Sequence, residues 1–345
     1  MDNKTLTSKI DFAVIISVKR AVANPNGDPL NGNRPRQTYD GYGEMSDVCL
    51  KRKARNRLQD MGESIFVQSD DNRVDKHRSL HDRFKEEPFV KDYYAQQKEK
   101  AKKKKNGTQK EPTGSMASTD DIDIRKEACN RWFDVRSFGQ VFAFEKSKKE
   151  KQGGKSEFSQ PDEDANANEN ASSEAHAKSD ESPDAVSIGI RGPVTIQSAF
   201  SIEPITPGSQ QIIKSVNLKT ENPPEKKGSD TMGMKHRVDK ETVYVAYGAI
   251  NTQLASKTCF SDADAEKIKE ALRTLFVNDA SSARPEGSME VLKVVWWKHN
   301  SKTGQYSSAK VHKSLGKILN PDGSFDEKAL ENALEGLVPE IIEGV

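Results

Sequence analysis

Alternating apolar side chains predict a buried central strand near the start of the chain. Between residues 11 and 19 every second position from 12 to 18 is apolar, and Ala13 and Ile15 make the other face largely apolar as well. Apolar residues on both faces are typical of a strand in the middle of a sheet. The same composition predicts further strands, which are 186–190, 194–196, 243–250 and 289–297.

Two segments carry apolar residues at helical spacing. The first begins at Ser46 or Asp47, either of which can cap a helix. Its apolar stripe consists of Leu50, Ala54, Leu58 and Met61. The second begins at Ser261 or Asp262, and its stripe consists of Ile268, Leu272, Leu275 and Phe276. A last short helix is predicted within 326–337.

The segments between these elements have loop or mixed character. Residues 20–42 are dense in Asn, Pro and Gly, which argues against both a helix and a regular strand. Residues 98–125 are predicted as a lysine-rich loop, and 131–144 have strand composition with a possible bulge at Gly139. Residues 146–185 have low complexity and should be disordered. Residues 205–240 are polar and predict a long hairpin-like excursion from the sheet.

The order of these elements predicts an α+β fold. Without its insertions the chain fits a strand–helix–strand–strand–helix–strand unit, which is the RRM-like or ferredoxin-like sandwich. Charge is distributed unevenly over it. Residues 157–185 carry nine acidic residues and one lysine, so the remainder of the chain has a net charge of +9 although the whole has +1. A basic body of this kind favours a polyanionic partner.

Several classes of protein are made improbable by what the sequence lacks. Its three cysteines, Cys49, Cys129 and Cys259, form no CxxC pair and indicate neither disulfides nor a zinc site. We find no phosphate-binding GxxxxGK[ST], no GxSxG and no GxGxxG. We expect no cofactor and no metal. No signal-peptide stretch or membrane-length apolar run is visible, so we expect a cytoplasmic protein that does not bind a membrane.

The strongest candidate for function is the loop and basic helix from Val18 to Leu58. The helix carries the run KRKARNR beside its apolar stripe, so we expect its cations to point outward together towards phosphate oxygens. Arg20, Arg34 and Arg36 flank or lie in the preceding loop and extend this track. Gly27 and Gly32 permit a close approach of the backbone to a ligand. A solvated helix face remains the plain alternative.

At this point the residues resemble a known family. NPNGDPLNGNRPR at 24–36, followed by DVCLKRKARN at 47–56, closely resembles the Cas-seven (Csd-two) backbone family of type I-C CRISPR Cascade complexes. DVRSFGQVF at 134–142, IRGPV at 190–194 and TMGMKHRV at 231–238 resemble further signatures of that family, in the family's order. One such motif would be weak, but several in order are specific.

The resemblance implies a non-catalytic scaffold with a palm, a protruding thumb and finger- or web-like insertions. Its expected partners are CRISPR RNA, further copies of the chain in a helical filament, the target DNA strand by way of the guide, and the cap, large and small Cascade subunits. The implied parts are 1–97 (first part of the palm), 98–125 (lysine-rich loop), 126–145 (palm strands), 146–185 (acidic insertion), 186–204 (palm or web strands), 205–242 (thumb) and 243–345 (remaining palm and C-terminal helix).

The residue roles follow from the motif positions. Met232 and Met234 are the expected thumb wedge that separates bases, with a minor packing contact as the alternative. The residues expected to bind RNA are Arg20, Asn24, Asn26, Gly27, Arg34, Arg36, Lys51, Arg52, Lys53, Arg55, Arg136, Arg191, Lys235, His236 and Arg237. For Arg136 and Arg191 a structural salt bridge is the alternative.

Two other functions compete with this interpretation. The first is an RNA endonuclease. His77 and His81 have the i, i+4 spacing of a metal-binding pair, although no HExxH is present, and an incidental pair is the simpler interpretation. Asp28 is the candidate for a catalytic loop aspartate, for which an ordinary turn residue is the simpler interpretation. A non-specific single-strand binder would show salt-dependent affinity without a regular footprint.

Overall fold

The computed structural model describes residues 5–19, 26–96, 119–144, 186–213, 231–238 and 240–345. The chain divides into two compact units. One comprises Met1–Gln140 with Ile190–Val345, and the other comprises Val141–Gly189. The described part of the second unit holds most of a two-stranded sheet, β5 (Gly139–Phe144) with β6 (Val186–Arg191). The predicted disorder of 146–185 concerns residues outside the described ranges.

Within the described residues of the first unit, nine strands form one sheet. Its strand order is β13-β12-β1-β11-β8-β4-β3-β2, and β7 pairs with β11 beside this path. The bounds are β1 (Ile10–Val18), β2 (Gly27–Asp28), β3 (Arg34–Gln37), β4 (Tyr42–Met45), β7 (Val194–Ile196), β8 (Ala199–Pro204), β11 (Thr242–Ile250), β12 (Met289–Lys298) and β13 (Glu340–Glu343). The order β12-β1-β11-β8 is that of a ferredoxin-like unit, so the α+β prediction is confirmed.

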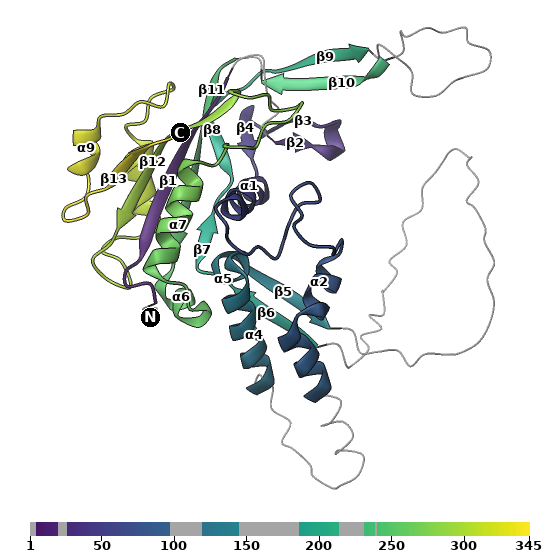
Figure 1. Cartoon of the computed structure of the whole chain (residues 1–345). Coiled ribbons are helices and arrows are strands. Elements are labelled where there is room, and N and C mark those ends of the chain that lie inside the picture. The colour runs from purple at the N-terminus through teal and green to yellow at the C-terminus, as the bar shows by residue number, and fades with distance from the viewer. Residues whose placement is uncertain (1–4, 20–25, 97–118, 145–185, 214–230, 239) are drawn as a thin grey trace, which may run out of the picture. The chain divides into compact units, whose positions relative to one another are not determined.

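Both faces of the central strand are covered, as its apolar pattern predicts. All nine residues of β1 are buried between the antiparallel partners β11 and β12. One face packs on the helices α1 (Asp47–Asp60) and α7 (Asp262–Arg273), which Figure 1 shows beside the sheet. The other face packs on α8 (Ser308–Gly316) and on the chain around α9 (Glu327–Glu331).

The two predicted amphipathic helices begin at the expected caps. Ser46 caps α1 by accepting a hydrogen bond from the Cys49 amide, and Ser261 forms a reciprocal capping box with Asp264 at α7. The predicted excursion contains β9 (Pro207–Ile213) and β10 (Thr231–Val238), which pair as an antiparallel two-stranded ribbon. Residues 214–230 between them lie outside the described ranges.

Several local predictions were wrong. The segment 20–42 contains β2, a 3-10 turn η1 (Pro29–Asn31), β3 and the start of β4. Asp28 caps η1. The strands in this segment are too short to produce a recognisable sequence pattern. The predicted strand 131–144 and the palm strands 126–145 are mostly helical, as α4 (Thr119–Arg131) and α5 (Phe133–Phe138) precede β5. Gly139, at φ +83°, ends α5.

The boundaries of other elements also differ from the prediction. Helix α4 begins inside the predicted lysine-rich loop 98–125, whose residues 98–118 lie outside the described ranges. The predicted helix 326–337 is helical only in α9, although Leu334 and Leu337 are buried. Helices α2 (Leu80–Glu86), α6 (Thr252–Thr258) and α8 had no strong apolar period and were not predicted.

Candidate nucleic-acid interface

The cations of α1 do not form the free track that the sequence predicted. Lys53 is 4% exposed and its ammonium group contacts the Asp279 carboxylate. Burial lowers the pKa of Lys53, and the Asp279 charge opposes that shift. The Arg55 guanidinium bonds the buried Asp134 carboxylate at 3.0 Å. These two side chains therefore connect α1 to segments that are distant in sequence.

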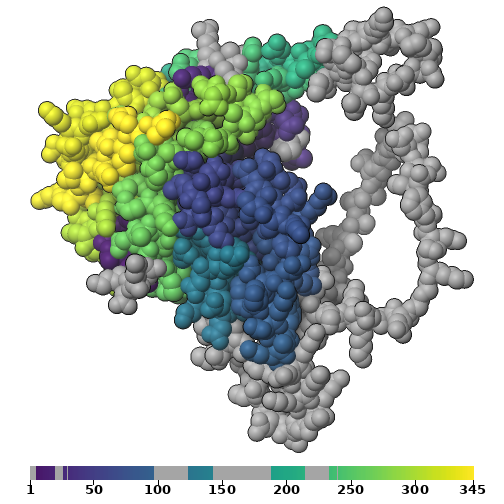
Figure 2. Space-filling view, viewed as in Figure 1, coloured from purple at the N-terminus to yellow at the C-terminus, as the bar shows by residue number. Residues whose placement is uncertain are grey.

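The remaining basic residues of α1 are also engaged. Lys51 pairs with Asp47 one turn earlier, at 2.9 Å. The Arg52 guanidinium donates to the Val67 carbonyl oxygen, and burial lowers the pKa of Arg52. Figure 2 shows the closely packed surface that α1 and the segment after it form with α7. The prediction that these cations all point outward was wrong, because carboxylates distant in sequence hold Lys53 and Arg55.

Of the two arginines at strand signatures, the structure gives one a structural role. Arg136 makes two bonds to the Asp264 carboxylate, at 3.1 and 2.9 Å, and donates to the Cys129 carbonyl oxygen. It also lies over the Phe133 ring. The salt-bridge alternative is therefore realised for Arg136. Arg191 differs, since it is exposed at the end of β6.

The loop before α1 is tied to the helix that follows it. The Asn26 side-chain amide donates to Ser46 Oγ at 2.9 Å, so it supports the cap of α1. Gly27 pairs with Pro35 between β2 and β3 and is half-buried. Arg20 and Asn24 lie outside the described residues. This part of the predicted site is thus an ordered turn, in which the Asn26 side chain stabilises the start of α1.

Strand β3 carries two arginines that remain available. Arg34 and Arg36 stand two residues apart, so their side chains share one face of the strand. Arg34 is exposed, whereas Arg36 is half-buried and its Nε atom is buried without a hydrogen-bond partner. A buried donor without an acceptor is costly.

The β9–β10 ribbon contacts β3, which brings residues about two hundred positions apart to one surface (Figure 1). Side chains alternate along β10, so Lys235 and Arg237 share one face and Met234 and His236 share the other. Lys235 is half-buried, and Arg237 donates to Gln210 at 3.2 Å. His236 is buried and bonds Ser209, so its predicted phosphate contact has no support in the geometry.

One face of the ribbon presents apolar side chains to solvent. Met234 is 52% exposed and Ile213 is 59% exposed. Met234 pairs with Gln211, and Ile213 lies two residues further along the same face. Ile213 was not among the predicted site residues, although it ends the run Gln-Gln-Ile-Ile. Met232 lies in β10, but its side chain is outside what the structure describes.

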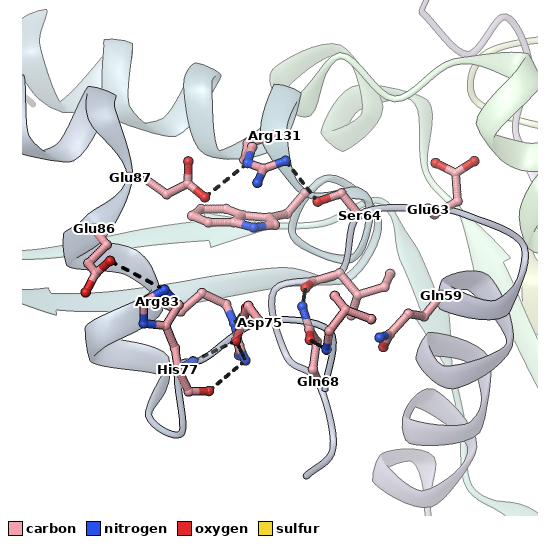
Figure 3. A pocket seen from close by; sticks show the side chains of 13 residues that line it. Gln59, Glu63, Ser64, Gln68, Asp75, His77, Arg83, Glu86, Glu87 and Arg131 are labelled. Carbon is pink, nitrogen blue, oxygen red and sulfur yellow. Dashed lines mark hydrogen bonds and ion pairs between the residues drawn. The ribbon is translucent and has the colours of Figure 1, made fainter. Parts of the chain in front are cut away.

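A polar cavity of about 430 Å³ lies between the end of α1, the following loop, α2 and α4. Figure 3 shows its charged side chains in pairs: Arg131 with Glu87, and Arg83 with Asp75. Glu86 adds a carboxylate that lies 3.6 Å from His77. The lining carries more carboxylates than cations, and its arginines are already paired with carboxylates. It therefore does not suit an RNA phosphate.

Candidate catalytic and metal groups do not converge. His77 contacts Glu86 and His81 contacts Asp82, which is a different pairing for each. The Asp28 carboxylate accepts a hydrogen bond from the Leu30 amide and so caps η1. In the described part of the chain no group of His, Cys, Asp and Glu is arranged to hold a metal ion. The described helices include none that is long and apolar enough to span a bilayer.

Comparison with known proteins gives three results. The family model for CRISPR-associated protein Cas7 matches residues 8–330. A CRISPR-associated protein Cas7 from Haloferax volcanii is 33% identical over 132 residues, which is 37% of this chain and 31% of that relative's length. A solved chain described as a CRISPR RNA-guided surveillance complex, pre-nicking, is similar with a TM-score of 0.43 and 13% identity, over 94% of this chain and 86% of the other.

Proposed function

Because the chain belongs to the Cas7 family of CRISPR-associated proteins, we propose that it is a non-catalytic scaffold that binds CRISPR RNA. In this proposal it is the backbone subunit of a type I-C (Csd-two) Cascade complex in the cytoplasm. Copies stack head to tail along the guide, because an interface that does not close into a ring produces a filament. The guide bases then pair with a target DNA strand, and cap, large and small subunits complete the assembly.

One observation carries the proposal: two arginines of β3, one exposed and one half-buried, lie beside a ribbon with an exposed apolar face. Arg34 and Arg36 on β3 supply two cations that suit phosphate oxygens. The adjoining β9–β10 ribbon presents Met234 and Ile213, which are bulky enough to displace a base from its stack. Unstacking costs a few kcal/mol per step, which apolar contact can offset. In the proposed complex this ribbon is the thumb.

The contacts of the rival catalytic groups favour a scaffold over an RNA endonuclease. The Asp28 carboxylate caps η1 by accepting a hydrogen bond from the Leu30 amide at 3.1 Å. This contact supports the role of an ordinary turn residue for Asp28. Lys53, Arg55 and Arg136, which the family resemblance assigns to RNA, each have a carboxylate partner within the chain. We therefore place the RNA contacts on β3 and β10, with Arg191 as a further contact.

The test is the pattern of RNA protection by the purified full chain. We expect a guide-length RNA to be protected from ribonuclease at evenly spaced positions, with exposed nucleotides between them, and to stay uncut when Mg²⁺ is added. A smooth pattern would indicate a non-specific single-strand binder. Specific cleavage of the RNA would favour the endonuclease. Short RNA with a repeat-derived handle should co-purify with the chain.

A pair of variants locates the contacts. Replacement of both Arg34 and Arg36 by Ala should lower RNA affinity, while the matched replacement of Lys313 and Lys317, two exposed lysines of α8 and the residue after it, should not. Equal losses for both pairs would show that net charge, and not the β3 surface, controls binding.

A further inference from the structure

The outer strands of the sheet carry exposed aromatic side chains on one face. In the centre of the sheet this face packs on α8 and on the chain around α9, where Val243 and Val245 are buried. Farther out, on β4 and β8, Tyr42 is 38% exposed and Phe200 is 45% exposed. Exposed apolar residues are common singly, but aromatic rings grouped on one sheet face suit a binding surface.

The strand register places these aromatics next to the β3 arginines. Arg36 pairs with Glu44 across β3 and β4, and Glu44 pairs with Phe200 across β4 and β8. Neighbouring strands are about 4.8 Å apart, so this row spans about 10 Å. Tyr42 stands two residues from Glu44 on the same face. One small area therefore combines Arg36, Tyr42 and Phe200.

The backbone beneath this area is held firmly. The Gly43 amide donates to Ser201 Oγ at 2.7 Å, and that hydroxyl donates to the Glu203 carbonyl oxygen. Gly43 faces the interior, where a Cβ atom would collide with the Tyr244 hydroxyl. A rigid frame lets exposed rings bind a flat partner with little loss of conformational entropy.

The turn from β3 to β4 adds a third ring. Tyr39 is as exposed as in an extended peptide, at 105%. The turn is closed by the Thr38 amide, which donates to the Tyr42 carbonyl oxygen at 2.8 Å, and by the Gly41 amide, which donates to the Thr38 carbonyl oxygen. Gly41 adopts φ +84°, a conformation that glycine tolerates best. The turn thus projects Tyr39 from an ordered support.

Charges on this face separate a phosphate side from a base side. Arg34 and Arg36 lie on β3, whereas the carboxylates of Asp40 and Glu44 lie in the turn and on β4. Glu44 accepts a hydrogen bond from Ser198 Oγ at 3.0 Å. Carboxylates repel phosphates but accept hydrogen bonds from the amino groups of bases. A strand would therefore place its phosphates at β3 and its bases over β4 and β8.

We infer that the exposed face of β3, β4 and β8 is a stacking platform for nucleobases of a single strand, with Tyr42 and Phe200 as its rings and Tyr39 at its edge. This inference rests on the proposed RNA-binding function and names a base-contact surface separate from the Met234–Ile213 face of the ribbon. Aromatic rings stack on any base, so the contact tolerates all sequences.

The test compares RNA with and without bases. Stacking energies imply that Tyr42→Ala or Phe200→Ala weakens binding of a short single-stranded RNA about tenfold, with Tyr42→Trp retaining affinity. On an abasic strand of equal length the Ala variants should bind as the parent does. Val338→Ala, which shortens another exposed apolar residue, should leave both affinities unchanged. Thermal unfolding of each variant confirms that it is folded.

Each remaining outcome has a distinct meaning. Unchanged RNA affinity in both Ala variants overturns the platform, and so does an equal loss on the abasic strand. Loss of self-assembly with intact RNA affinity would show that the face binds another polypeptide, which also overturns it. If the parent chain fails to bind RNA at all, the proposed function fails, whereas failure of the platform leaves that function standing.

Discussion

Replacement of Asp134 by Ala should destabilise the fold strongly, because this carboxylate supports α1 and the loop after it. Asp134 is 1% exposed and accepts hydrogen bonds from the Phe66 amide at 2.7 Å, from the Val67 amide at 3.0 Å and from Arg55 at 3.0 Å. The substitution leaves two backbone donors and a largely buried guanidinium without an acceptor. An unsatisfied buried group costs about 1–3 kcal/mol. Removal of one partner from a buried ion pair costs about 3–5 kcal/mol, so we expect a loss of at least about 3 kcal/mol.

The assay is urea unfolding followed by tryptophan fluorescence, since Trp132 is buried two residues from the site. Asp70→Ala is the matched control, because Asp70 is 88% exposed and its ion pair with Arg73 should contribute less than about 1 kcal/mol. If Asp134→Ala lowers the free energy of unfolding by less than about 1 kcal/mol, the structural role given to the Arg55–Asp134 pair is refuted. That result would return Arg55 to the set of residues available for RNA.

Three further predictions concern packing, pH and salt. Gly43→Ala should lower the free energy of unfolding, measured in urea, since the added Cβ meets the Tyr244 hydroxyl. Burial lowers the pKa of His312 from 6.5, so the unfolded chain takes up a proton first and stability should fall as pH drops below about 6.5; His312→Gln should reduce this dependence in thermal melts. Replacement of Arg34 and Arg36 by Ala should reduce the salt slope of RNA affinity by about 1.4, at about 0.7 per phosphate contact; an unchanged slope would contradict phosphate contacts at β3.

The sequence predicted long periodic elements well and short ones poorly. The strand β1 and the helices α1 and α7 have enough apolar positions for their periodicity to be evident. The two helices also begin at a serine that caps them. Helix α5 has strand-like composition, yet it is helical because Phe133 and Val135 are buried and Asp134 bonds another segment. Tertiary contacts override local propensity in such short elements.

The two segments that hold the proposed site were singled out from the sequence, but the partners of their side chains were not. The loop before α1 and the later excursion were both identified, and the structure brings β3 and β10 into contact. Which arginines are free did not follow from spacing, because the carboxylates that engage Lys53 and Arg136 lie more than one hundred residues away. Tyr42 and Phe200 carry no motif, and only strand pairing places them on one face.

By itself, the sequence determined that the chain has an α+β core with a buried central strand, and that its family signatures lie in order along the chain. Apolar periodicity and local motifs are properties of neighbouring residues, so they can be read without coordinates. Only the tertiary structure decided which charges are available to a partner. A charge is free or engaged according to residues that the fold brings near it, and sequence distance does not report that.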